Sequence, residues 1–200
     1  MPISFEHKFK FIHIPKTGGS SIEEVFSLFN KKNFWRPTFI YKIEKCYFAP
    51  QHLTHNLLDH FSPESKDWFS FTYVRNPYTK IVSEYFYIHR SFYNVVIDNF
   101  TEDHFKDWIV NDLVKFDMDH KLPQSTFIDK EVDMVLKFEN IQEDFKKLCN
   151  KLNVKHELTH TQKDKGNINK NKIVEQLSKE TKDLIYNIFK KDFEMFNYSR

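Results

Sequence analysis

Cysteine is scarce in this 200-residue chain, which contains Cys46 and Cys149 and no others. Both residues lie in stretches rich in apolar side chains. Small secreted scaffolds held together by disulfides carry far more cysteines in far shorter chains. That class of protein is therefore not expected, and both thiols are predicted to be free and in the core.

Net charge is also small, because 30 Lys and Arg residues are balanced by 28 Asp and Glu residues. A formal charge of +2 does not predict a protein that coats nucleic acid, so any anion site must be local. No uncharged apolar run reaches about 18 residues, and no membrane helix is expected. The few residues before the first predicted strand include Glu6 and His7, which leaves no room for a signal peptide. The chain is expected to be soluble and cytoplasmic.

Apolar residues recur with the periods of strands and helices along the whole chain. Core strands are predicted over 8–14, 68–74 and 134–138, with shorter strands near 39–43 and 46–48. Helices are predicted after Gly19, within 51–61, and behind expected caps at Asn76, Thr101, Asn140 (paired with Glu143) and Ser178. Alternating strands and helices indicate an α/β fold with a mainly parallel sheet. Since no repeat or linker is visible, residues 1–200 are expected to form one domain.

The segment FIHIPKTGGSSIEEVF has the layout of an anion-binding turn between a strand and a helix. Gly18 and Gly19 allow a tight turn and a close approach to a ligand. Lys16 adds positive charge, and Thr17, Ser20 and Ser21 add hydroxyl donors at the start of the helix. The lysine precedes the glycines, whereas in the Walker A loop of nucleotide kinases it follows them. The segment predicts a site for a phosphate or sulfate ester, and the alternative is an ordinary helix cap beside a surface lysine.

A second polar group follows the strand at 68–74. Arg75 lies at the end of this strand, and Ser83 follows eight residues later in VRNPYTKIVSEY. A guanidinium at a sheet edge suits a bound phosphate. Alternatively, Arg75 forms an ion pair with a carboxylate of a neighbouring loop.

Together, HIPKTGGSSI and VRNPYTKIVSEY resemble the two ordered motifs of the carbohydrate-type sulfotransferases, which depend on 3′-phosphoadenosine 5′-phosphosulfate (PAPS). The separation of about sixty residues is also similar to that family's spacing. The blocks PQSTFI, VDMVLKFENIQEDFKKL and YNIFKKDFEMFNY resemble its later strand–helix unit and last helix, so the resemblance spans nearly the whole chain. It implies a three-layer, P-loop-like fold.

The resemblance also implies the roles of the two motifs. The first loop, comprising Lys16, Thr17, Gly18, Gly19, Ser20 and Ser21, would hold the 5′-phosphosulfate. Arg75 and Ser83 would hold the 3′-phosphate, with 3′,5′-bisphosphoadenosine (PAP) as the product and no metal required. Lys16 would be catalytic as well, at the oxygen that bridges phosphorus and sulfur. In HTQKDK (160–165), Gln162 and Asp164 depart from the family's pattern, and Lys165 is a further expected cofactor contact.

The sequence identifies the residues that would act on the acceptor hydroxyl less directly. The resemblance of QHLT points to His52 as the base that takes the acceptor's proton, and the rate should then rise with pH through about 6–7.5. The alternatives are His55, a carboxylate such as Glu84 or Asp59, a solvated loop histidine, or a metal site made of His52, His55 and His60. His13 is interpreted as a packed strand residue.

A sugar hydroxyl is the acceptor that the resemblance favours, and no nucleic-acid or membrane partner is expected. Tyr85, Tyr87, Phe92 and Tyr93 could stack on a sugar ring or belong to the core. The other functional classes left open are a catalytically silent module that binds a phosphoadenosine nucleotide and a P-loop kinase-like enzyme. The oligomeric state is also open.

Overall fold

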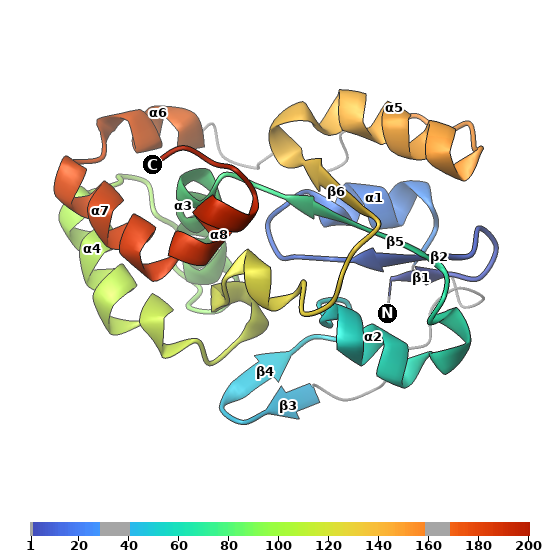
Figure 1. Ribbon diagram of the computed structural model, residues 1–200. Helices are drawn as coiled ribbons and strands as arrows, with labels where there is room; N and C mark the ends of the chain where they lie inside the picture. The colour runs from blue at the N-terminus through green and yellow to red at the C-terminus, as the bar shows by residue number, and fades with distance from the viewer. Residues whose placement is uncertain (1, 29–40, 159–168) are drawn as a thin grey trace.

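The computed structural model describes residues 2–28, 41–158 and 169–200. Its main sheet has the strand order β1 (Ile3–Ser4), β2 (Phe9–Ile12), β5 (Phe69–Val74) and β6 (Met134–Lys137). The pairs β2–β5 and β5–β6 are parallel, whereas β1 runs antiparallel to β2 at the edge (Figure 1). The expected α/β class with a mainly parallel sheet is confirmed.

Helices cover both faces of this sheet, because successive strand residues point to opposite faces. Phe9, Phe11, Phe71 and Tyr73 form one apolar cluster with residues of α1 (Gly19–Val25) and α5 (Ile141–Leu152). Ile12 and Val74 belong to a second cluster, which includes Leu58 of α2 (His55–Phe61). Figure 1 shows α1 and α5 above the sheet and α2 below it. The arrangement is therefore the three-layer one that was expected.

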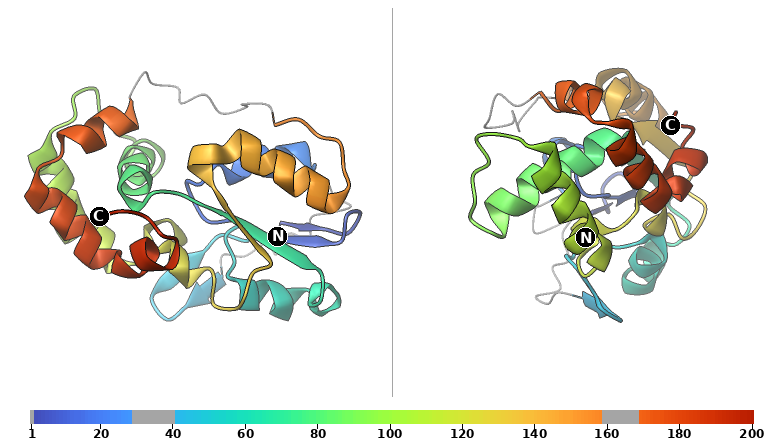
Figure 2. Two further views of the ribbon diagram at one scale, coloured as in Figure 1. Left: turned by 45° about the horizontal axis from the view of Figure 1, so that its top comes forward. Right: turned by 90° about the vertical axis from the view of Figure 1, so that its left-hand side faces the viewer.

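A third apolar cluster is entirely helical. It joins α3 (Pro77–Ser91) to α4 (Glu102–Asn111), α6 (Lys170–Gln176), α7 (Lys179–Ile188) and α8 (Lys190–Met195). Figure 2 shows α4 and the three carboxy-terminal helices gathered around α3, beside the sheet. Because α3 begins where β5 ends, this helical part stands next to the carboxyl ends of the parallel strands.

A small hairpin and several 3₁₀ turns complete the described fold. Strands β3 (Tyr41–Ile43) and β4 (Cys46–Phe48) form the hairpin, close to the predicted positions. The 3₁₀ turns are η1 (Pro63–Ser65), η2 (Leu113–Lys115), η3 (Asp119–Lys121), η4 (Gln124–Thr126) and η5 (Phe138–Asn140). Turn η3 lies beside the hairpin, where the backbone N–H of Tyr47 donates to the carbonyl of Asp117 at 3.0 Å.

Most predicted helix starts are confirmed. Asn76 caps α3 by accepting from the N–H of Tyr78 at 3.0 Å, and Ser178 caps α7 through Thr181. Thr101 directly precedes α4 as expected, but its side chain makes no capping hydrogen bond. The Asn140–Glu143 capping pair was wrong, because the Asn140 side chain caps nothing and Glu143 instead forms a 2.7 Å ion pair with Lys146. Strand β1 and helix α6 were not predicted, and each has seven residues or fewer. The expected last helical region is divided into α7 and α8.

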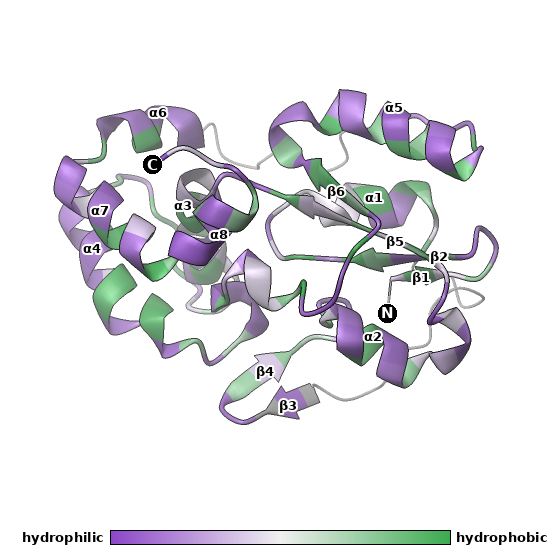
Figure 3. Ribbon diagram, in the orientation of Figure 1, coloured by the Kyte–Doolittle hydropathy of each residue, from purple (hydrophilic) through white to green (hydrophobic). Residues whose placement is uncertain are grey.

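Hydrophilic and hydrophobic residues are mixed along the described helices. Figure 3 shows hydrophilic residues over much of α5, α7 and α8, with hydrophobic residues between them. Among the described helices, none is long and apolar enough to cross a membrane. Cys46 and Cys149 are both free, as predicted, although Cys46 is only partly buried.

Candidate active site

The turn after β2 has an unusual backbone. Lys16 and Gly18 both have positive φ, 63° and 86°, and Gly18 directly precedes α1. At Gly19, an added Cβ would lie only 2.1 Å from Cδ2 and 2.2 Å from Nε2 of His13. The two glycines therefore permit different things: Gly18 permits the left-handed turn, and Gly19 permits contact with the His13 ring.

The hydroxyl groups of this loop divide into two kinds. The buried Thr17 hydroxyl donates to the carbonyl of Ile14 at 2.8 Å, so it shapes the turn. Ser20 and Ser21 are partly exposed in the first turn of α1, which begins one residue earlier than expected, at Gly19. The structure thus places all six residues of the first motif in one compact turn.

Arg75 reaches this loop from the end of β5. Its Nη1 donates to the carbonyl of Lys16 at 3.2 Å, its Nε donates to Thr79 Oγ1 at 3.0 Å, and its guanidinium lies 4.3 Å from the Phe138 ring. The Arg75 backbone is held separately, since the Gln124 side chain accepts from its N–H and donates to its carbonyl, both at 2.8 Å. Two motifs about sixty residues apart therefore meet where β2 and β5 end. Ligands bind at this edge of parallel sheets.

Two further residues of the motifs lie on or against α3. The Lys16 ammonium lies 4.1 Å from the centroid of the Tyr87 ring. Ser83, expected to share a phosphate with Arg75, is buried on the same helix. Lys165 and the rest of 160–165 lie outside the described residues.

His52 is buried and held by a carboxylate that sequence reasoning missed. Its Nδ1 donates to Asp119 Oδ2 at 2.9 Å, and the Gln51 amide nitrogen lies 3.3 Å from its Nε2. Asp119 also accepts from the backbone N–H groups of Ala49 and His120, both at 2.7 Å. Burial lowers the pKa of His52 to about 4, against the opposing effect of the Asp119 hydrogen bond. The ring is therefore neutral at neutral pH.

Two more histidines flank His52. The His13 ring lies 4.8 Å from it and the His120 ring 5.0 Å, both edge to face. The Nδ1 of His13 contacts Glu23, and the Nδ1 of His120 contacts Glu84, both at 2.8 Å. The result is a row of three buried imidazoles, each with its own carboxylate. His13 is indeed packed, as interpreted, and also stacks on Phe11.

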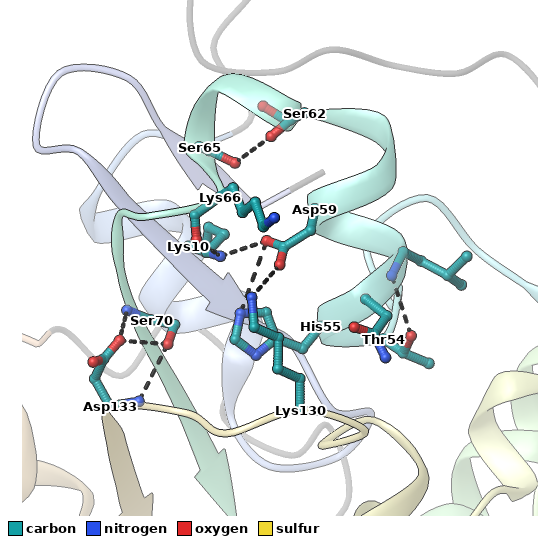
Figure 4. A network of polar contacts seen from close by, with 12 residues as sticks. Lys10, Thr54, His55, Asp59, Ser62, Ser65, Lys66, Ser70, Lys130 and Asp133 are labelled. Atoms are coloured by element: carbon teal, nitrogen blue, oxygen red, sulfur yellow. Dashed lines mark hydrogen bonds and ion pairs between the residues drawn. The ribbon is translucent and has the colours of Figure 1, made fainter.

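His55 and His60 are not part of this row. Figure 4 shows His55 among Lys10, Asp59 and Lys130, on the α2 side of the sheet, with its Nε2 4.0 Å from Asp59 Oδ1. His60 is exposed. The suggested metal set of His52, His55 and His60 is therefore wrong. Among the described residues, His52, Asp119 and His120 have ligating atoms within 4.8 Å of one another, but both histidines already direct Nδ1 to carboxylates.

The four aromatic residues proposed for sugar stacking lie in different environments. Tyr85 is fully buried in the helical core. Tyr87 stacks on His120, with centroids 4.6 Å apart and planes 10° apart. Phe92 is 52% exposed and lies 6.0 Å from the Tyr87 ring, whereas Tyr93 bonds to Asp112. Tyr87 and Phe92 thus adjoin the site, and Tyr85 belongs to the core.

A mainly parallel sheet flanked by helices, with a glycine turn, a lysine and an arginine at its carboxyl edge, defines a P-loop-like α/β protein. The model of the Sulfotransferase family matches residues 2–199, so the chain belongs to that family and is a transferase of sulfuryl groups. Comparison with curated proteins gave no match, nor did comparison with solved structures.

Proposed function

We propose that this enzyme moves a sulfuryl group from PAPS to the hydroxyl of a carbohydrate, with His52 as the base. The observation that carries the proposal is the buried His52–Asp119 pair. The His52 ring lies against the ring of His13, and His13 in turn packs against Gly19 of the glycine turn. A base and its orienting carboxylate are thereby held close to the predicted anion site.

The residues present fit the expected cofactor. The turn of Lys16, Thr17, Gly18, Gly19, Ser20 and Ser21 would hold the phosphosulfate, and Arg75 with Ser83 would hold the 3′-phosphate. The support is that Lys16 and Arg75 meet at one end of the sheet and both have cationic side chains. Lys165 is a further proposed contact. When bound, PAPS supplies the sulfuryl group, whose sulfur bonds to the acceptor oxygen as its bond to the phosphate oxygen breaks and leaves the electron pair on that oxygen.

Lys16 has the role of stabilising this negative charge as it develops. An ammonium next to a leaving oxygen lowers the energy of the transition state more than that of the ground state. No metal is required in this proposal, because the chain itself supplies the positive charge.

His52 takes the acceptor's proton at Nε2. Since Nδ1 carries the proton donated to Asp119, Nε2 presents its lone pair and accepts from the Gln51 amide. An acceptor hydroxyl would replace that amide as the donor. Asp119 would then stabilise the imidazolium as it forms, and the proton would pass to water. The exposed Phe92 ring near Tyr87 supports a sugar as the acceptor, because a sugar can lie against an aromatic face.

A thermal-shift screen tests the cofactor assignment. PAP should raise the melting temperature, whereas AMP, ATP and GTP at the same concentration should have little effect. Equal stabilisation by ATP would favour a kinase-like enzyme instead. Turnover of PAPS with a panel of glycans and simple phenols then separates an active enzyme from a silent nucleotide-binding module.

A further inference from the structure

His120 contacts residues from both parts of the proposed site. Its ring stacks on Tyr87 at 4.6 Å, and the Lys16 ammonium lies 4.1 Å from the centroid of the same Tyr87 ring. On its other side, the His120 ring is 5.0 Å from that of His52. His120 is therefore a direct neighbour of His52 and of Tyr87, the ring that the Lys16 ammonium contacts.

We propose that His120, oriented by Glu84, contacts the transferred sulfuryl group through Nε2. This inference rests on the proposed function, since it assumes that PAPS binds at the glycine turn. It adds a residue that neither sequence motif contains, and it gives Glu84 an orienting role rather than that of a base.

The geometry leaves one ring nitrogen of His120 for a ligand. Nδ1 is 2.8 Å from Glu84 Oε1, and stacking on Tyr87 fixes the plane of the ring. The turn itself is held because the backbone N–H of His120 donates to Asp119 Oδ1 at 2.7 Å. Nε2 therefore projects away from Glu84 in a fixed direction.

Charged groups of both signs lie near the His120 ring. Glu84 is fully buried, and its Oε2 has no hydrogen-bond partner among the described residues. Lys80 is also buried, 4.0 Å from that oxygen and without a hydrogen bond, and burial lowers its pKa. Lys16, Lys80 and His52 are the basic groups near the ring, and Glu84 and Asp119 are the acidic ones. In the proposed contact, Nε2–H donates to a sulfuryl oxygen while Nδ1–H donates to Glu84.

The test is a binding measurement without acceptor. Isothermal titration gives the affinities for PAPS and for PAP in His120→Gln, Glu84→Gln, the wild type and the control His60→Gln, whose parent side chain is exposed. EDTA is present throughout. Because only PAPS carries the sulfuryl group, PAP affinity also reports whether each variant is folded.

The ratio of the two affinities gives the answer. His120→Gln should weaken PAPS binding about tenfold, the loss expected for one charged hydrogen bond, and leave PAP binding within about twofold. Glu84→Gln should change the ratio in the same direction by less, and His60→Gln should not change it. An unchanged ratio in His120→Gln, whether or not both affinities fall, would overturn the inference. Failure of the wild type to bind either nucleotide would instead overturn the proposed function.

Discussion

His52 is a weaker base than free histidine, because burial lowers its pKa to about 4. A base must be neutral to accept a proton, so a lowered pKa widens the pH range over which His52 can act. The rate should therefore be nearly flat from about pH 6 to 8 and fall as pH decreases through about 4. For a histidine with an ordinary pKa, the rate would instead rise between about pH 6 and 7.5. The lowered pKa of His52 moves this rise in rate to about pH 4.

The pH dependence of kcat/KM with a fixed acceptor measures this limb. His52→Gln should abolish most activity across the range while PAP still binds, and His60→Gln should behave as the wild type. A limb that stays near pH ~6.5 would mean that His52 is solvated in the working enzyme.

Lys16 is predicted to act on rate more than on binding. Lys16→Ala should reduce turnover by about 10²–10³, the usual loss for one group that stabilises a developing oxyanion. Its effect on PAP affinity should be much smaller. Single-turnover rates and PAP titrations on the same preparation compare the two. A collapse of PAP affinity with unchanged turnover would make Lys16 a binding residue only.

At the scale of elements, the junction of β5 and α3 joins the two motifs. Gln124 holds the Arg75 backbone independently of the Arg75 side chain. Arg75→Ala should therefore leave the fold intact while reducing the preference for PAP over AMP by about ten- to a hundredfold. Titration with both nucleotides and thermal melts test this, with the exposed Arg90→Ala as control. Unfolding of Arg75→Ala would show that the side chain is structural.

Turn η3 is joined to the segment before α2 by one carboxylate. Asp119 accepts from Ala49 N–H, His52 and His120 N–H, so it orders both the turn and the proposed base. Asp119→Asn should lower turnover by about 10²–10⁴, the range attributed to a positioned base, and should leave PAP affinity nearly unchanged. The neighbouring Asp117→Asn is the control. Combining Asp119→Asn with His52→Gln should add little further loss, and full additivity would show that the two act separately.

At the scale of the whole molecule, a buried ion pair joins the sheet to α2. Lys10 is 1% exposed and contacts Asp59 at 2.5 Å, and Asp59 also bonds to Lys130 at 2.6 Å (Figure 4). Asp59→Asn would leave the buried Lys10 ammonium with the carbonyl of Lys66 at 2.9 Å but without its carboxylate, and loss of a buried charged partner typically costs about 3–5 kcal/mol of stability. Urea unfolding measures this, with the exposed Asp67→Asn as control. A loss below about 1 kcal/mol would indicate that water replaces the partner.

The same pair predicts how stability depends on pH. Burial alone would raise the pKa of Asp59, but the hydrogen bonds from Lys10 and Lys130 outweigh it and lower the pKa. The pair therefore stabilises the fold above the ordinary carboxyl pKa of about 4, and this stabilisation is lost as pH falls below it. In Asp59→Asn, the free energy of unfolding should therefore decrease less than in the wild type as pH falls below about 4.

The fold class and the glycine turn could be predicted because their signals are local. Alternating Phe9 and Phe11, the Gly18–Gly19 pair, and Asn76 before Pro77 each act through neighbours within a few residues. Local signals also have limits. Asn140 and Glu143 have the spacing of a capping pair, yet Glu143 pairs with Lys146 on the surface.

The sequence by itself determined the order of the main strands and helices and the two motifs, because hydrophobic period and turn chemistry are short-range properties. Only the tertiary structure decided the partners of the histidines. Asp119 is 67 residues from His52, and His120 is 36 residues from Glu84, so no spacing rule connects them. Burial, which lowers the pKa of His52, likewise exists only when distant segments pack together. Packing placed His52 in the row of imidazoles and His55 beside Lys10, although the two are three residues apart and of the same type.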